Sequence, residues 1–228
     1  MKELVAVEIA KRVKTGDVIG VGTGSTVDAA LSAIGKRITN ERMSIHVVPT
    51  SLQSAWRCQE IGLNVMYPGY RGELSWGFDG ADEVDHEFRL IKGKGGALLQ
   101  EKILAARCRR FVVIVDETKV VSKLGERCAI PLEVIPEAMA VVERELKLLA
   151  PQKIELRNAV GGKHGPVITE AGNVILDVKF DLIRAGLERE LKSIVGVVES
   201  GLLVGFASEV LVASAKGVSR LERRTAMP

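Results

Sequence analysis

The sequence has few of the residues that mark several large classes of protein. Its 228 residues include three cysteines, Cys58, Cys108 and Cys128, whose odd number and wide spacing suit neither a disulfide framework nor a CxxC metal or redox pair. No stretch reaches the roughly 18 apolar residues of a membrane span, and the first residues lack the apolar core of a signal peptide. These features predict a soluble cytoplasmic protein without a membrane partner.

An excess of one charge is also missing. The 32 lysines and arginines are mixed along the chain with 29 aspartates and glutamates, which gives a net charge of +3. Because no basic arm or stripe is present, we expect no nucleic-acid partner. Apolar residues make up 46% of the chain and charged residues 27%, although aromatic residues reach only 4%. This usage is typical of a globular protein with one large domain, or with one domain that carries a smaller one.

The first half of the sequence predicts an open α/β sheet. Short apolar runs that suit buried strands alternate with segments of helical pattern, and this rhythm favours a parallel sheet with crossover helices. The expected strands are 17–21, 45–49, 63–67 and 111–115, and the expected helices are 3–13, 26–36, 51–61 and 96–109.

After Gly125 the order of elements changes. The expected elements are a strand at 128–135, a helix at 137–149, strands at 153–159 and 174–178, a helix at 181–192 and a strand at 195–200. This is the β-α-β-β-α-β order of a ferredoxin-like unit, and the apolar run 210–212 predicts one more strand for the first sheet. The predicted fold class is therefore α/β, with a Rossmann-like open-sheet domain at 1–125 and 202–228 and an inserted ferredoxin-like α+β lid domain at 126–201.

A glycine-rich segment, GVGTGST at 20–26, lies between an expected strand and an expected helix. Glycines let a backbone approach a ligand closely, and the N–H groups at a helix start, with the hydroxyl groups of Thr23, Ser25 and Thr26, suit a phosphate. The alternative is a tight turn with Ser25 or Thr26 as the helix cap, and we favour the phosphate site. The spacing does not match the G-x-G-x-x-G of dinucleotide sites, and the segment lacks the lysine of a P-loop.

Four carboxylates lie within seven residues in the segment DGADEVD at 79–85. A solvated acidic loop, a metal site and an acid/base pair are about equally compatible with such a cluster. Asp79 and Asp82 flank a glycine-containing turn, which would bring both to a pocket at the end of a strand. Because His86 is the only histidine nearby, acid/base or hydroxyl-binding roles are preferred and no metal site is predicted.

The segment KGKGGALLQEK at 92–102 places two lysines and three glycines ahead of an expected helix, which predicts an anion-binding loop rather than a solvated basic turn. Within that helix, Glu101 falls on an arc flanked by apolar residues, where a raised pKa would suit a general base or acid. A core ion pair with a lysine or arginine is an equally good interpretation. Lys119, just past the apolar run 111–115, would bring a second cation to the same ligand face, although this signal is weak alone.

These segments, in this order and together with VDETK at 115–119, resemble those of the type A ribose-5-phosphate isomerases. The resemblance continues in PLEVIP at 131–136 and GNVILD at 172–177, so it covers nearly the whole chain. It implies an α/β domain with a small α+β lid, assembled as a homodimer or homotetramer. It also implies an aldose–ketose isomerase that acts on a sugar phosphate without a metal or an organic cofactor.

The resemblance also implies roles for particular residues. Glu101 would be the base that carries a proton between C1 and C2. Asp79 and Asp82 would bind the hydroxyl groups of the open sugar, help ring opening and move the oxygen-bound proton. Lys92, with the loop N–H groups, would stabilise the negative charge of an enediolate. The implied substrate-binding residues are Thr23, Gly24, Ser25, Thr26, Asp79, Gly80, Ala81, Asp82, Lys92, Gly93, Lys94, Gly95 and Lys119.

One position departs from the family pattern, and two other classes of protein compete with the isomerase. Lys94 stands where the family usually continues a run of glycines, and it would either strengthen anion binding or point to solvent. A sugar-phosphate sensor would need a DNA-binding module, for which the residues before Gly20 are too few, and it would not need Glu101. A nicotinamide-dependent dehydrogenase fails on the glycine spacing and on the lack of an evident acidic ribose-binding residue about 20 positions later.

Overall fold

The computed structural model describes residues 1–66, 69–162 and 164–222. Two predictions extend beyond these ranges: residue 67 of the expected strand 63–67, and residues 223–228 of the expected first domain. Among the described residues, no helix has both the length and the apolar character needed to cross a membrane.

A seven-stranded sheet forms the centre of the larger part of the molecule, with the strand order β14-β13-β7-β4-β1-β2-β3. Neighbouring strands are parallel except for β13 and β14, which form an antiparallel pair. The strands are β1 (Val18–Val21), β2 (His46–Pro49), β3 (Asn64–Val65), β4 (Trp76–Asp79), β7 (Phe111–Asp116), β13 (Glu209–Ser214) and β14 (Gly217–Arg220). Most are short and rich in valine and isoleucine, as is usual for parallel strands buried on both faces.

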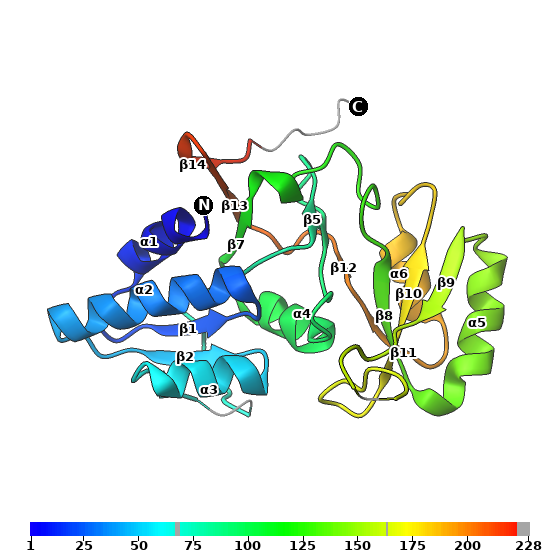
Figure 1. The fold of residues 1–228 in the computed structure, drawn as a ribbon, viewed down its shortest axis with the longest axis horizontal. Helices are drawn as coiled ribbons and strands as arrows, with labels where there is room; N and C mark the ends of the chain where they lie inside the picture. Colours follow the sequence, from blue (N-terminus) through cyan, green and yellow to red (C-terminus); the bar gives the residue numbers. More distant parts are fainter. Residues whose placement is uncertain (67–68, 163, 223–228) are drawn as a thin grey trace.

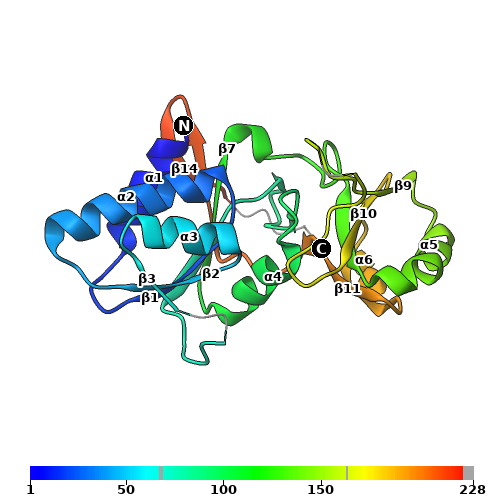
Figure 2. The ribbon, with the colours of Figure 1, turned by 60° about the horizontal axis from the view of Figure 1, so that its bottom comes forward.

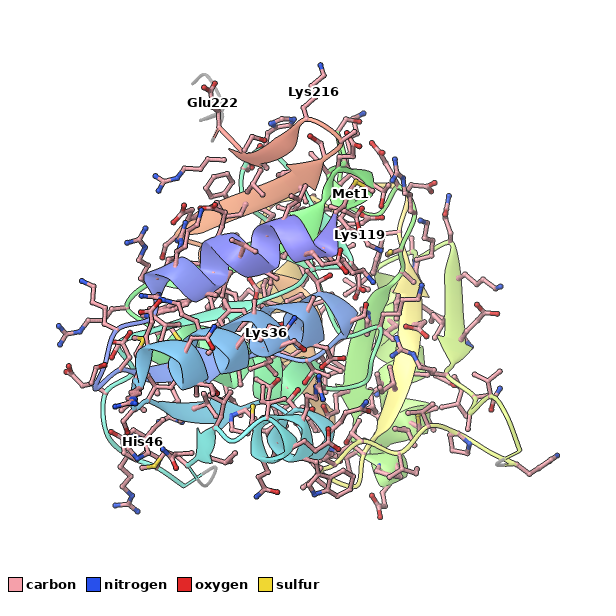
Figure 3. The ribbon with its side chains drawn as sticks, turned by 60° about the vertical axis from the view of Figure 1, so that its left-hand side comes forward. Met1, Lys36, His46, Lys119, Lys216 and Glu222 are labelled. Atoms are coloured by element: carbon pink, nitrogen blue, oxygen red, sulfur yellow. The ribbon has the colours of Figure 1, made fainter. Side chains whose placement is uncertain are left out.

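Helices cover both faces of this sheet, and the alternation of side chains along β7 shows how. Val112 and Ile114 pack in one apolar cluster with helices α1 (Lys2–Arg12), α2 (Ser25–Glu41) and α3 (Leu52–Glu60). The intervening Phe111, Val113 and Val115 pack in another cluster, to which α4 (Leu98–Arg107) contributes. Figure 2 shows α4 on the opposite side of the sheet from α2 and α3, and Figure 3 shows α1 and α2 lying across the front of the sheet.

A separate antiparallel sheet, with the strand order β11-β8-β10-β9, lies to the right in Figure 1. Its elements follow in the chain as β8 (Ile130–Val134), α5 (Met139–Leu148), β9 (Lys153–Leu156), β10 (Val174–Lys179), α6 (Leu187–Ser193) and β11 (Val197–Ser200). We call residues 130–200 the α+β unit. Its element order is that of a ferredoxin-like motif, and the predicted α/β fold class is confirmed. The domain boundaries stay a prediction.

Three very short strands lie between the two sheets in Figure 1. They are β5 (Glu83–Val84), β6 (Leu90–Ile91) and β12 (Leu202–Leu203), in the order β12-β6-β5. The sequence pattern did not predict this sheet or β14, and it placed Asp79 at the end of a strand without giving that strand, β4, any bounds. The expected helices also ended α2 too early and began α6 too early. The extra turn of α2 carries an ion pair between Arg37 and Glu41, a spacing that stabilises a polar helix end.

Candidate active site

A pocket of about 230 Å³ opens near the carboxyl ends of β1 and β4, the edge at which open α/β sheets bind ligands. A larger depression of about 610 Å³, around Arg12, Trp76 and Arg110, lies at the opposite edge of the sheet. Every residue of the predicted site except Asp79 and Gly95 lines the smaller pocket. Its lining residues are Thr23, Gly24, Ser25, Thr26, Val27, Gly80, Ala81, Asp82, Lys92, Gly93, Lys94, Glu101 and Lys119.

The glycines of the first segment allow β1 to end directly against Asp79. A Cβ atom at Gly22 would lie 1.9 Å from the carboxylate carbon of Asp79, so no side chain fits there. Gly24 has a φ of 125°, which disfavours other residues, and α2 begins at the next residue. The N-terminus of α2 therefore faces the pocket with Ser25 and Thr26, as an anion site requires.

Two contacts in this segment were not foreseen. Lys2 donates a hydrogen bond of 2.7 Å from Nζ to Ser25 Oγ, which places a further cation at the start of α2. The two residues are 23 positions apart, and no local pattern marks Lys2. Thr23 lines the pocket, but its hydroxyl group lies 2.8 Å from both Thr50 Oγ1 and Ser51 Oγ. The Thr23 side chain therefore holds the loop against the start of α3.

Three ionisable side chains form a buried triad beneath the pocket: Asp79, Lys92 and Glu101. They come from the end of β4, the residue after β6 and the first turn of α4. Lys92 Nζ lies 2.9 Å from Asp79 Oδ2 and 3.3 Å from Glu101 Oε1. Their exposed fractions are 0%, 3% and 5% in chain order. Lys92 also donates to the Gly80 carbonyl oxygen at 2.6 Å.

The two carboxyl groups of the triad have different surroundings. Asp79 Oδ1 accepts hydrogen bonds from the N–H groups of Gly80, at 2.7 Å, and Thr23, at 3.2 Å. Glu101 Oε2 is buried and has no hydrogen-bond partner in the described parts of the chain. Because Glu101 belongs to the pocket lining, this carboxyl group is available to a ligand. The two interpretations of Glu101 from the sequence, a core ion pair and a general base or acid, thus each describe part of its environment. Oε1 is paired with Lys92, and Oε2 has no partner in the described residues.

Burial makes the triad hold a proton that exposed carboxylates would lose. It raises the pKa of Glu101 to about 8, a rise that Lys92 opposes and Asp79 increases. Burial also raises the pKa of Asp79, against the effect of Lys92. It disfavours the Lys92 ammonium, but the charges of Asp79 and Glu101 outweigh this effect and raise the lysine's pKa above its ordinary value. A charged lysine therefore lies beside a carboxyl group that exchanges its proton near neutral pH.

The second glycine-rich segment lies across the pocket from the first. Asp82 Oδ2 accepts a 2.9 Å hydrogen bond from the Lys94 N–H group, which ties this loop to the aspartate. The side chains of Lys94 and Lys119 both line the pocket, and neither ammonium group forms an ion pair within the described ranges. The pocket therefore contains two cations that a ligand anion can neutralise.

The acidic segment 79–85 does not act as a single cluster. Glu83 accepts three backbone hydrogen bonds of 2.6 Å, from Gly125, Arg127 and Cys128. Asp85 pairs with Arg89 at 2.7 Å. These two carboxylates hold loops together, whereas Asp82 lines the pocket and Asp79 lies buried beneath it. Within residues 1–66, 69–162 and 164–222, no three or more His, Cys, Asp or Glu side chains gather in a way that could hold a metal ion.

Comparison with known proteins finds relatives over almost the whole chain. The model of the family described as ribose 5-phosphate isomerase A (phosphoriboisomerase A) matches residues 46–217. The ribose-5-phosphate isomerase A of Synechococcus sp. is 43% identical over 220 residues, which cover 95% of this chain and 94% of that protein. The ribose-5-phosphate isomerase A of Thermococcus kodakarensis is 42% identical over 226 residues, which cover 98% of each chain.

Solved structures give the same result. A ribose 5-phosphate isomerase A from Methanocaldococcus jannaschii has a TM-score of 0.91 and 41% identity, over 96% of this chain and 97% of that chain. A D-ribose-5-phosphate isomerase in complex with phospho-erythronic acid has a TM-score of 0.93 and 40% identity, over 97% of both chains.

Proposed function

Because the chain belongs to the ribose 5-phosphate isomerase A family, we propose that it interconverts D-ribose 5-phosphate and D-ribulose 5-phosphate through an enediolate. The observation that carries this proposal is the buried triad beside the pocket, in which Glu101 Oε2 has no hydrogen-bond partner among the described residues. An aldose–ketose exchange needs a base, a movable proton and a fixed cation near the developing oxyanion. The triad provides these groups without a cofactor.

Glu101 is the base in this mechanism. Its carboxylate removes the proton from C2 of the open-chain aldose and returns it to C1, and the reverse reaction uses the same group. A pKa of about 8 makes the carboxylate a stronger base than an exposed glutamate, yet ionised in a useful fraction of molecules near neutral pH. Lys92, held 3.3 Å from this carboxylate, stabilises the negative charge that appears on the enediolate oxygens.

Asp79 and Asp82 handle the oxygen-bound protons in the same proposal. Asp82 lines the pocket and is oriented by the Lys94 N–H group, so it can bind sugar hydroxyl groups and assist ring opening. Asp79 lies deeper, beside Lys92, where its raised pKa allows it to exchange a proton with the substrate oxygens. The turn residues Gly80 and Ala81 form the wall between them.

The phosphate group is bound at the other side of the pocket. The segment from Thr23 to Thr26, which leads into α2, offers N–H groups and the hydroxyl groups of Ser25 and Thr26, and Lys119 and Lys94 offer positive charge. The loop 93–95 completes this side. The phospho-erythronic acid bound by one relative carries a phosphate at one end and a planar carboxylate at the other. A phosphorylated enediolate presents the same two negatively charged ends.

Three further statements belong to the proposal. The reaction would serve the non-oxidative pentose phosphate pathway. The free thiols of Cys58, Cys108 and Cys128 fit the reducing cytoplasm. Assembly as a homodimer or homotetramer rests on the family resemblance, and light scattering coupled to gel filtration tests it. A sugar-phosphate sensor is not favoured, because a sensor has no use for a buried carboxyl group with a raised pKa.

The first experiment follows ribulose 5-phosphate formation from ribose 5-phosphate by the purified protein after exhaustive chelation. Conversion at an undiminished rate supports both the reaction and the cofactor-free mechanism. Conversion that returns only with an added divalent cation would overturn the cofactor-free mechanism. No conversion under either condition would overturn the isomerase proposal itself.

A further inference from the structure

An arginine from the α+β unit holds the loop 93–96 of the candidate active site. Arg157, which follows β9, donates from Nη1 to the carbonyl oxygens of Gly93, at 2.7 Å, and Lys94, at 3.1 Å. The other edge of the same guanidinium binds Asp177 of β10, with Nε 2.8 Å from Oδ2 and Nη2 paired with Oδ1. The Arg157 side chain is 16% exposed. One planar group thus links β10 to two consecutive peptides of the loop.

The backbone of Arg157 is itself fixed in the α+β unit. Its N–H group donates to the Ile175 carbonyl oxygen at 2.8 Å, and its own carbonyl oxygen accepts from the Val167 N–H group at 2.8 Å. The guanidinium therefore extends from a rigid base. Figure 3 shows the strands of this unit standing beside the end of the large sheet.

These contacts determine where the loop N–H groups point. In a trans peptide the N–H group lies opposite the carbonyl oxygen. Because Arg157 holds the Gly93 carbonyl oxygen, the Lys94 N–H group points away from the arginine, and it donates to Asp82 Oδ2 at 2.9 Å. The Lys94 carbonyl oxygen is held in the same way, which directs the Gly95 N–H group to the same side.

The loop needs such an external support because its own sequence does not fix its shape. It contains three glycines, whose backbones have the greatest conformational freedom of any residue, and Gly93 and Gly96 have φ values of 101° and 87°. Its internal hydrogen bond joins the Gly96 N–H group to the Gly93 carbonyl oxygen at 3.0 Å, so Arg157 binds a carbonyl that already closes the turn.

We propose that Arg157, oriented by Asp177, is a positioning residue for catalysis: it sets the conformation of the loop 93–96 and, through the Lys94 N–H group, the orientation of Asp82. This inference rests on the proposed isomerase function for its kinetic consequences only. A lysine cannot replace the arginine, because a single ammonium group cannot bind Asp177 along one edge and two carbonyl oxygens from the other.

The test compares Arg157→Gln with a control, Arg184→Gln, which removes an exposed ion pair with Glu190 in the same unit. Hydrogen exchange of the 92–98 backbone, followed by mass spectrometry, measures the loop directly and needs no substrate. Steady-state kinetics with ribose 5-phosphate measure the consequence. We expect faster exchange in this segment and a kcat reduced on the order of 10- to 100-fold, the effect of a small misplacement of catalytic groups, with both properties unchanged in the control.

A double variant separates positioning from a general structural effect. If Arg157 acts through Asp82, then Arg157→Gln added to Asp82→Asn reduces kcat much less than it does in the wild-type background. Equal losses in both backgrounds, or normal exchange at 92–98 in folded Arg157→Gln, would overturn the proposal. If Arg157→Gln does not fold, Asp177→Asn replaces it with the same readouts. An inactive wild-type protein refutes the isomerase function, while the exchange result still decides whether Arg157 holds the loop.

Discussion

Replacing Glu101 by glutamine separates the proposed proton-transfer role of this side chain from its packing role. The amide has the same shape and keeps a contact with Lys92, but it cannot accept a proton from carbon. General acid/base catalysis contributes on the order of 10²- to 10⁴-fold to a rate, so kcat should fall by at least that factor. Binding of phospho-erythronic acid, measured by calorimetry, should change only a few-fold, because the phosphate side of the pocket is untouched.

The same substitution should change how stability depends on pH. Glu101 has a pKa of about 8 in the folded protein against an ordinary value of 4.5. Between these values the folded state binds a proton that the unfolded state releases, so this group lowers the free energy of unfolding as pH rises from about 5 to 8. At about 1.4 kcal/mol for each pH unit, the loss amounts to a few kcal/mol. Denaturant unfolding at pH 5, 6.5 and 8 should show this decline in the wild type and a smaller one in Glu101→Gln.

The pH dependence of activity should report the same ionisation of Glu101, but with the opposite trend: activity should rise with pH where stability falls. The value of kcat/KM should rise with pH along a limb set by Glu101 near 8, well above the substrate phosphate, whose second pKa is about 6. Glu101→Gln retaining near-wild-type turnover would refute the assignment of this residue as the base. A wild-type stability that does not fall between pH 5 and 8 would refute the argument from burial.

Three further predictions concern charge and space around the site and the sheet. Lys94→Gly removes one of the two pocket cations that form no ion pair within the described residues. In steady-state assays KM for ribose 5-phosphate should rise several-fold while kcat stays within about two-fold, because the phosphate end does not change in the transition state. Hydrogen bonds from Arg12 lower the pKa of Glu209 to about 2, so Glu209 contributes stability that is lost as pH falls from about 4.5 to 2. In thermal scans, Glu209→Gln should therefore lower the melting temperature at pH 7. The melting temperature of this variant should also fall less between pH 4.5 and 2 than that of the wild type. Gly22→Ala places a methyl group within 1.9 Å of the Asp79 carboxylate carbon, and it should lower both kcat and the free energy of unfolding, the latter by about 1–3 kcal/mol in urea titrations.

The sequence located the parallel sheet because its signals are local. Runs such as 111–115 are entirely apolar, and in the structure their alternate side chains fill two different clusters on the two faces of the sheet. The segments 20–26 and 92–102 were also recognisable as candidate ligand-binding loops, because glycine-rich turns follow strands and precede helices at one edge of such a sheet, whereas the individual substrate-binding residues were implied by the family resemblance. The low-hydrophobicity end of α2 and the two-residue strands β5, β6 and β12 carry no such signal, and these were missed.

Contacts between distant segments explain the rest of what was not predicted. Glu101 and Lys92 are nine positions apart, on opposite sides of a glycine-rich turn, and only the folded chain shows that they form a buried triad with Asp79. Lys2 reaches Ser25, and Arg157 reaches Gly93 across 64 positions. Neither residue lies in a motif, because each acts through one long side chain whose target is set by the packing of separate elements.

The buried triad connects the stability of this protein to its activity. Its two carboxyl groups and one ammonium group would have a net charge of −1 if all were ionised, and burial disfavours that state in an apolar environment. The proton that relieves this charge is held most tightly at Glu101, because two N–H groups stabilise the Asp79 carboxylate, whereas Glu101 Oε2 has no hydrogen-bond partner among the described residues. The ionised form of Glu101, which would remove the substrate proton in the proposed mechanism, is therefore also the less stable form of the folded protein. Binding an anionic sugar phosphate adds further negative charge, which the cations that line the pocket, Lys94 and Lys119, offset.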